Sequence, residues 1–212
     1  MSELNTKYSD KEEKLNIATH AFGFLLSVIA FPFLVLKAML LEGFWKPVSI
    51  LIFGFSLIIL YAASTFYHAA TKPKLRRRLN IFDHAAIYVL IAGTYTPFTI
   101  ITLEGNTGWI IFGLTWFFAL TGIILKLFFT GKFDKLSTIM YVLMGWQIVF
   151  AISPLLEKLS VEGLFWLFAG GVFYTVGAVL YSIKKIPYNH AIFHFFVLAG
   201  SLSHFISIYY YV

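Results

Sequence analysis

The sequence contains no cysteine and few charged residues. Without cysteine, disulfide bonds and thiolate chemistry are excluded, and any bound metal must be held by nitrogen or oxygen ligands. Only 12% of the 212 residues are charged, whereas 59% are hydrophobic and 19% aromatic, and the mean hydropathy is +0.82. Ordinary soluble domains do not have this balance. The composition therefore indicates an integral membrane protein.

The net charge of +6 does not indicate a nucleic-acid partner. The basic residues lie in short polar segments between long apolar runs, where orientation in the membrane explains them. A cleavable signal peptide is not expected, because the first sixteen residues are polar and the first apolar run is long enough to span a membrane. We therefore expect a multi-pass protein of the cell membrane that does not bind nucleic acid.

Seven apolar runs reach the length of about 20 residues that is needed to cross about 30 Å of hydrocarbon. No linker or change of composition divides them, so the predicted fold is an all-α bundle of seven transmembrane helices. We assign residues 1–16 to a short N-terminal segment and residues 17–212 to the transmembrane domain. The predicted spans are Ile17–Leu41, Pro47–Ala70, Ile81–Leu103, Trp109–Phe129, Leu136–Leu156, Leu164–Ile183 and Asn189–Tyr211.

Thirteen of the sixteen Lys and Arg residues fall in alternate polar segments. They are Lys7, Lys11, Lys14, the five basic residues from Lys72 to Arg78, Lys126, Lys132, Lys135, Lys184 and Lys185. The opposite side holds only Lys37, Lys46 and Lys158. Because basic residues are enriched in cytoplasmic loops, this division predicts a cytoplasmic N-terminus and an external C-terminus.

The stretch 61–85 places two ionisable residues just inside neighbouring spans. His68 precedes Lys72 by four residues, and Asp83 follows Arg78 by five. At a rise of about 1.5 Å per residue, each lies about 6 to 8 Å from the basic turn between the spans. Ionisable residues at this depth in a membrane are costly and mostly mark functional sites.

The last span supplies two more histidines at the same end of the bundle. His190 and His194 are four residues apart, so their rings share one helix face with Cβ atoms about 5 to 6 Å apart. This spacing suits two imidazoles that bind one zinc ion at about 2.0 to 2.1 Å. With His68 as the third ligand, a fourth position stays open for water, as in catalytic zinc sites.

The roles of the neighbouring polar side chains stay open. Asp83 is a direct ligand, pairs with the Arg76–Arg78 cluster, or holds a water molecule at the metal and accepts its proton. Ser64 lies four residues before His68 and shares its face. Its hydroxyl either bonds the carbonyl four residues earlier in its own helix or donates to a developing oxyanion or to that water.

The remaining histidines have simpler interpretations. His20 begins the first span at a similar depth, where it competes for the third ligand position or packs beside the site. His84 is about 100° around the helix from Asp83, which directs it to lipid headgroups or to the surroundings of the metal. His204 lies about 15 Å beyond His194 along the helix, too far to share an ion. We expect it to form a hydrogen bond with another helix.

Five short motifs follow one another in the chain. They are N-x-x-T-H-x-x-G from Asn16 to Gly23, S-x-x-x-H from Ser64 to His68, F-D-H-A from Phe82 to Ala85, A-G-T-Y-T-P from Ala92 to Pro97 and H-x-x-x-H from His190 to His194. In this order they resemble the bacterial haemolysin-III proteins, the prokaryotic branch of the progestin and adipoQ receptor family. The resemblance covers essentially all seven spans and extends to the adiponectin receptors and, more distantly, the alkaline ceramidases.

The resemblance implies an intramembrane zinc ion held by His68, His190 and His194, with Asp83 near the metal water and Ser64 close by. It also implies hydrolysis of lipid amides such as ceramide. We therefore expect a zinc-dependent hydrolase that acts on a lipid-like amide or ester in membrane lipid homeostasis, with membrane lipids as partners and an architecture compatible with a homo-oligomer. The rival hypotheses are a lipid-responsive sensor with structural zinc and a haemolysin-type protein that permeabilises membranes.

The predicted orientation can be tested with reporters fused to the chain ends. A reporter that is active only in the cytoplasm should be active at Met1 and silent at Val212, and a reporter that is active only outside should show the reverse. Activity normalised to protein level checks this. If both ends report from the same side, the number of spans is even and the histidines do not share one end of the bundle.

Overall fold

The computed structural model describes residues 8–129 and 134–212. These residues contain seven helices that are long and apolar enough to cross a membrane. The described residues contain no strand, so the predicted all-α, seven-span fold is confirmed. Lys7 and Lys132, which enter the predicted orientation, lie outside the described residues, as does the side chain of Lys135. The orientation itself stays a prediction.

Five of the spans are single helices and two are interrupted. The single helices are α1 (Asp10–Met39), α2 (Trp45–Ala69), α4 (Gly105–Phe129), α7 (Val161–Ser182) and α8 (Asn189–Tyr211). The third span is α3 (Pro73–Pro97) followed by the π-helix η1 (Phe98–Leu103), and the fifth is α5 (Asp134–Gly145), the 3-10 helix η2 (Gln147–Ala151) and α6 (Ile152–Lys158). The helix type changes directly after Pro97, which has no N–H for the helical ladder.

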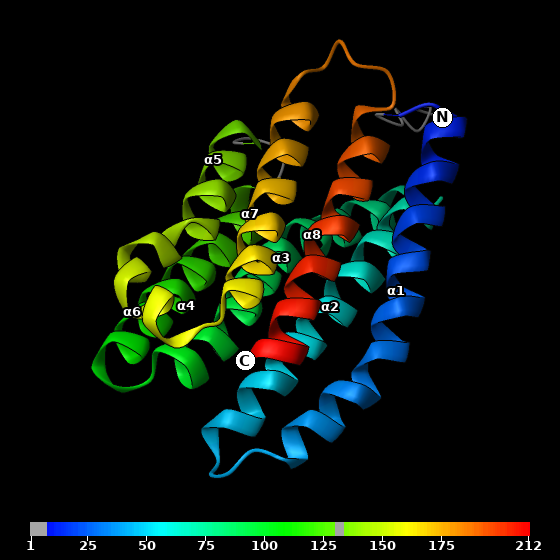
Figure 1. Ribbon diagram of the computed structural model, residues 1–212. Coiled ribbons are helices and arrows are strands. Elements are labelled where there is room, and N and C mark those ends of the chain that lie inside the picture. Colours follow the sequence, from blue (N-terminus) through cyan, green and yellow to red (C-terminus); the bar gives the residue numbers. More distant parts are fainter. Residues whose placement is uncertain (1–7, 130–133) are drawn as a thin grey trace.

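The helices pack so that the start of α8 meets the end of α2. Helix α1 contacts both α2 and α8, while α7 packs along α8 (Figure 1). Helix α3 packs against α2 and α4, and α5 contacts α3, α4 and α7. The start of α1 and the end of α8 lie toward opposite ends of the bundle (Figure 1). The first turns of α1 and α8 and the last turn of α2 therefore come together at one end.

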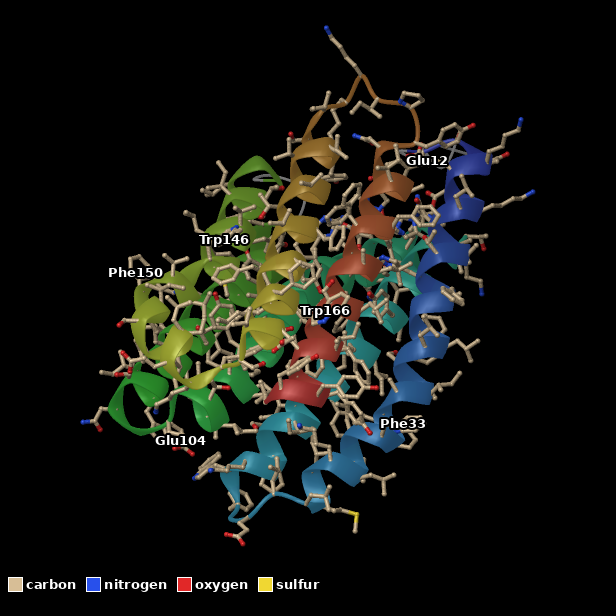
Figure 2. The ribbon with its side chains drawn as sticks, viewed as in Figure 1. Glu12, Phe33, Glu104, Trp146, Phe150 and Trp166 are labelled. Atoms are coloured by element: carbon tan, nitrogen blue, oxygen red, sulfur yellow. The ribbon has the colours of Figure 1, made fainter. Side chains whose placement is uncertain are left out.

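Many large apolar side chains face outward and many polar ones face inward, as in a multi-pass membrane protein. Phe33 is 50% exposed and Phe150 88% exposed, and both project from the bundle (Figure 2). The buried residues include Asn16, His20 and Ser64. Lipid solvates an apolar exterior, whereas polar groups in the hydrocarbon region must find partners or a function inside the protein.

Helix α1 begins before the apolar run does. Ser9 caps it by accepting a hydrogen bond from the backbone N–H of Glu12 at 3.3 Å. The acidic residues of the first turn also complement the positive end of the helix dipole. The helix thus starts at Asp10, earlier than the span predicted from Ile17. As a consequence, Glu13 is carried on a regular helix and is buried.

Helices α7 and α8 approach so closely that Gly170 leaves no room for a methyl group. A Cβ atom there would lie 2.3 Å from the His204 ring, whereas one at Gly171 would meet nothing nearer than 3.6 Å. Gly170→Ala should lower the free energy of unfolding by about 1 to 3 kcal/mol, because overpacking displaces the ring. Gly171→Ala is the matched control and should be neutral or slightly stabilising. Equal Tm values for the two variants in one detergent would contradict this packing.

Candidate metal centre

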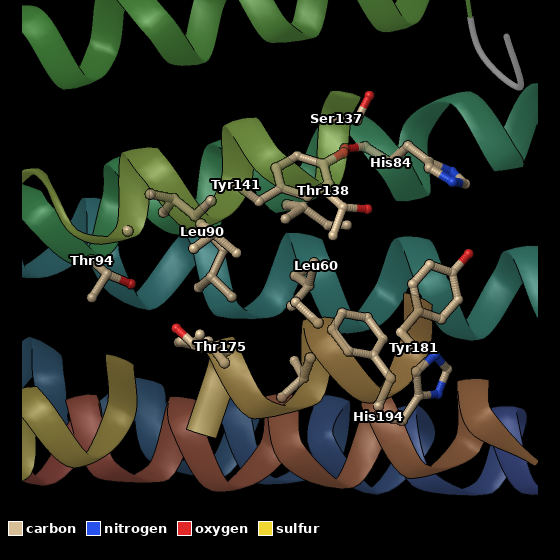
Figure 3. A pocket seen from close by; sticks show the side chains of 18 of the residues that line it. Leu60, His84, Leu90, Thr94, Ser137, Thr138, Tyr141, Thr175, Tyr181 and His194 are labelled. Atoms are coloured by element: carbon tan, nitrogen blue, oxygen red, sulfur yellow. The ribbon is translucent and has the colours of Figure 1, made fainter. Parts of the chain in front are cut away.

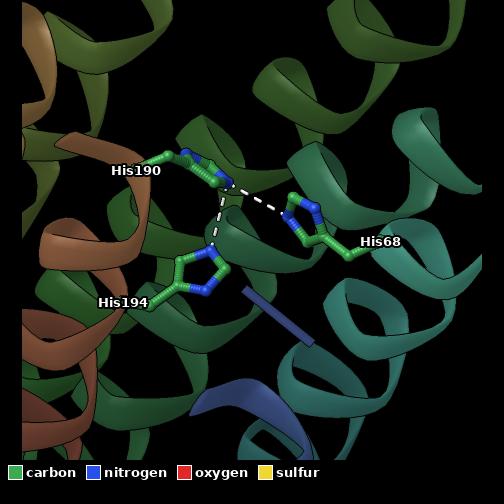
Figure 4. Close-up of side chains that lie close together, drawn as sticks. All are labelled: His68, His190 and His194. Atoms are coloured by element: carbon green, nitrogen blue, oxygen red, sulfur yellow. Dashed lines mark hydrogen bonds between the residues drawn. The ribbon is translucent and has the colours of Figure 1, made fainter. Parts of the chain in front are cut away.

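Three buried histidines from two helices meet near one end of the bundle. His68 lies in the last turn of α2, while His190 and His194 lie in the first two turns of α8. Nε2 of His190 is 3.1 Å from Nε2 of His68 and 3.1 Å from Nε2 of His194 (Figure 4). One nitrogen from each ring lies within 4.8 Å of the others, so the group could hold a metal ion. The structure thus brings together the three histidines that depth and spacing select.

A carboxylate holds the outer side of the His68 ring. Oε2 of Glu13 lies 2.7 Å from Nδ1 of His68. Because a carboxylate only accepts hydrogen bonds, Nδ1 carries a proton, and in the neutral ring Nε2 then points its lone pair at the other histidines. The second oxygen of Glu13 pairs with Arg76. This carboxylate–histidine pair is the arrangement that orients imidazole ligands in metal sites.

A hydroxyl holds His194 in the same way. Oγ1 of Thr19 lies 3.1 Å from Nδ1 of His194. The hydroxyl proton is directed back into α1, with the carbonyl oxygens of Leu15 and Asn16 at 2.8 and 3.1 Å. The Thr19 oxygen therefore accepts from Nδ1–H, and Nε2 of His194 is left without a proton.

The proton count at the centre of the cluster favours a cation. When both rings are neutral, Nε2 of His68 and Nε2 of His194 lack a proton, and Nε2 of His190 can donate only one. The two contacts of 3.1 Å therefore cannot both be ordinary hydrogen bonds. A tetrahedral zinc ion with bonds of about 2.0 to 2.1 Å separates its nitrogen ligands by about 3.3 to 3.4 Å. The donor set thus fits a divalent metal bound by three neutral imidazoles.

The start of α8 is fixed by contacts with α7 and with the segment before α1. Asn189 donates from Nδ2 to the carbonyl oxygen of Tyr181 at 2.8 Å. The His190 ring stacks on Tyr8, with centroids 4.6 Å apart and planes at 16°. Burial, with a smaller contribution from Tyr181, raises the pKa of Tyr8, so its phenol stays neutral beside the imidazole. These contacts hold the His190 ring toward the cluster.

The other candidate histidines lie outside the cluster. The His20 ring stacks on His194 with centroids 3.5 Å apart and planes at 13°, so it packs beside the group and does not join it. His84 donates from Nδ1 to a backbone carbonyl of its own helix at 2.8 Å. His204 donates from Nε2 to the carbonyl oxygen of Leu167 at 3.1 Å, which is the interhelical bond predicted for it.

A cavity of about 140 Å³ adjoins the cluster (Figure 3). It extends along α8 from His190 to His204, which corresponds to about 21 Å of helix. Most of its wall is apolar and includes Leu60, Leu90 and Val197. A long, mainly apolar cavity beside a cluster of histidines suits an amphiphilic ligand.

Asp83 and Ser64 line this cavity without belonging to the histidine group. Oδ2 of Asp83 lies 3.8 Å from Nδ1 of His84. Among the described residues no ion pair joins Asp83 to the Arg76–Arg78 cluster, because Arg76 pairs with Glu13. Oγ of Ser64 is buried and has no hydrogen-bond partner in the described part of the chain, so the bond to its own helix does not form. Both side chains are available to a molecule in the cavity.

Glu13 and Thr19 are site residues that the sequence interpretation missed. Both lie on α1 and contact the outer nitrogens of two histidines. A signal was present in their spacing. Asn16 follows Glu13 by three residues, and Thr19 and His20 follow Asn16 by three and four, which places a polar stripe on one face of an otherwise apolar helix.

Comparison with known proteins gives matches along almost the whole chain. The sequence profile described as Haemolysin-III related matches residues 8–205. The chain is 46% identical over 204 residues to the Hemolysin-3 homolog of Bacillus subtilis (strain 168), covering 96% of each chain. It is 45% identical over 202 residues to Hemolysin-3 of Bacillus cereus, covering 95% of this chain and 92% of that one. The Monocyte to macrophage differentiation factor of Homo sapiens is 26% identical over 211 residues, with coverage of 95% and 84%. No solved structure matches significantly.

The cluster predicts one zinc ion per chain. His190→Ala and His194→Ala should each abolish zinc retention, because two imidazoles do not complete the site. His204→Ala on the same helix is the matched control and should retain the ion. Elemental analysis of the purified variants measures both. A metal-free wild type with intact histidines, or loss of zinc in His204→Ala, would contradict the assignment.

Proposed function

The chain belongs to the haemolysin-III-related family, and from this membership and the buried histidine cluster we propose that it is a zinc-dependent hydrolase within the membrane. Its proposed substrate is a lipid-like amide or ester, and its proposed role is in membrane lipid homeostasis. One observation carries the proposal: three imidazoles converge beside a cavity that Asp83 and Ser64 also line.

Zinc is the metal that the donor set supports best. Imidazole ligands suit first-row divalent metals, and no thiolate is available in the chain. Three protein ligands leave one position open, as in catalytic zinc sites, whereas structural sites are closed by four. When bound, the ion supplies Lewis acidity and makes water nucleophilic near neutral pH.

Asp83 is the proposed proton acceptor. Its carboxylate faces the cavity and is not paired with an arginine of the described chain. A carboxylate placed in this way can take a proton from the attacking water and pass it to the leaving amine or alcohol. The buried position excludes bulk water, which strengthens the interaction of this charge with the reacting groups.

Ser64 is the proposed donor to the developing oxyanion. It lies one helical turn before His68 on α2, and its buried hydroxyl has no partner among the described residues. A buried polar group without a hydrogen bond costs about 1 to 3 kcal/mol. A carbonyl oxygen that gains negative charge beside it would satisfy the hydroxyl and be stabilised in turn.

The cavity supports a lipid as the substrate. It is mainly apolar and extends over about 21 Å of α8, a length that a fatty acyl chain can occupy. The scissile amide or ester would then lie at the end near His190 and His194. One relative is named Hemolysin-3 and another Hemolysin-3 homolog, so membrane leakage belongs in the same assay.

Asp83→Asn should separate hydrolysis from metal binding. Asparagine keeps the shape of the side chain but cannot accept the proton, so lipid turnover should fall by about 10²- to 10⁴-fold. Zinc content and Tm should change little, because the three histidines hold the ion. Turnover of a ceramide and of a matched ester in vesicles, with zinc content and Tm, measures this. Asp10→Asn, an exposed carboxylate of α1, is the matched control.

Each other outcome selects a different function or role. Loss of zinc in Asp83→Asn would make Asp83 a metal ligand, and full turnover with zinc retained would exclude it as the base. Release of an entrapped dye without lipid turnover would favour membrane permeabilisation. A zinc-loaded wild type that turns over no lipid and releases no dye would favour the sensor.

A further inference from the structure

The segment from Tyr8 to His20 contacts every histidine of the cluster without contributing a ligand. Glu13 bonds the outer nitrogen of His68, and Thr19 bonds that of His194, at 2.7 and 3.1 Å. The Tyr8 ring stacks on the His190 ring, and the His20 ring stacks on the His194 ring. The ligands come from α2 and α8, and α1 packs against both helices (Figure 1). Helix α1 and Tyr8 before it therefore contact the histidine cluster from outside.

Arg76 extends this arrangement from the first turns of α3. Its guanidinium pairs with Glu13 and donates to the carbonyl oxygens of Tyr67, His68 and Ala70 at 3.5, 3.2 and 3.2 Å. Those carbonyls lie at the C-terminal end of α2, where the last backbone carbonyls lack the donors of a further helical turn, although the Tyr67 oxygen also accepts from the Ala70 N–H at 3.3 Å. One side chain thus fixes both the backbone of His68 and the carboxylate that holds its ring.

The neighbouring basic residues show that the role of Arg76 is specific and does not come from positive charge alone. Arg77 and Arg78 are exposed, whereas the side chains of Arg76 and Glu13 are 13% and 12% exposed. A basic residue near the start of a helix opposes the helix dipole, so α3 gains nothing from Arg76 at this position. A buried carboxylate is costly unless it is paired and hydrogen-bonded. Glu13 meets that condition only between Arg76 and His68.

We propose that Glu13 and Thr19 are positioning residues that set the affinity of the histidine cluster for its metal, and that Arg76 acts through Glu13. The proposal rests on the metal site of the proposed function and does not depend on the reaction proposed there. An acceptor at Nδ1 fixes the tautomer and the orientation of the ring and raises the basicity of Nε2. Without that acceptor the ring can turn or carry its proton on Nε2, where it blocks a metal.

Zinc affinity of the purified full-length chain, measured by competition with a chelator, tests the proposal. Glu13→Gln replaces the carboxylate by a weaker, neutral acceptor and Thr19→Val removes the acceptor, so each should weaken binding by about 10- to 100-fold, the usual effect of disturbing a partner of a metal-bound histidine. Asp10→Asn removes an exposed acid from the same helix turn and should stay within about twofold of wild type. Thr121→Val removes an exposed hydroxyl with the same bond to its own helix and should do likewise.

Arg76 is tested by a double-variant cycle. Arg76→Gln should weaken zinc binding, and the Glu13→Gln, Arg76→Gln double variant should bind no more weakly than Glu13→Gln alone, because the arginine acts through the carboxylate. Arg77→Gln is the exposed control and should bind as wild type does. Losses that add in the double variant would overturn the role assigned to Arg76.

Cobalt in place of zinc separates positioning from a general loss of stability. Its visible absorption reports ligand geometry, and the bands should shift in Glu13→Gln and Thr19→Val but not in the controls. Wild-type affinity and spectrum in both variants would overturn the proposal and leave the metal site intact. If Glu13→Gln does not fold, Thr19→Val, which changes no charge, still tests the proposal. A wild type that binds neither zinc nor cobalt would overturn the metal centre and this inference with it.

Discussion

The site depends on the repulsion between imidazole lone pairs that meet inside an apolar bundle. The outer nitrogens of His68 and His194 carry protons and donate hydrogen bonds to Glu13 and Thr19. In the neutral rings the two inner nitrogens are then left without protons, only 3.1 Å from Nε2 of His190. A cation removes this conflict more completely than a single shared proton can. The burial of Glu13, and the need for a guanidinium beside it, follow from the same requirement.

The bundle concentrates its polar chemistry at one end of a cavity that is otherwise apolar. In such surroundings the dielectric screening is weak, so a carboxylate such as Asp83 or a hydroxyl such as Ser64 acts more strongly than it would in water. The same surroundings accept the hydrocarbon of a lipid. A membrane-embedded site can therefore combine binding of an insoluble molecule with polar chemistry at one point, provided that water reaches that point.

The fold could be predicted because hydropathy and length decide which segments span a membrane, and helical rise then gives the depth of each histidine. Rotation about the helix axes could not be predicted in this way. His20 and His68 have similar depths, and only packing shows that the first stacks beside the cluster while the second joins it. Sequence proximity suggested an arginine partner for Asp83, but Arg76 instead reaches Glu13 on α1. Glu13 was missed because the polar start of α1 was assigned to a segment outside the membrane domain.

The histidines of the cluster also lie far apart along the chain, since His68 and His190 are separated by 122 residues. An ion bound between them would be a cross-link that closes a long loop and restricts the unfolded chain. Synthesis proceeds from the N-terminus, so α1 and α2 are made long before α8. A chain that stalls before its last helix therefore lacks two of the three imidazoles. Metal content would then distinguish fully assembled molecules from incomplete ones, whatever reaction the site performs.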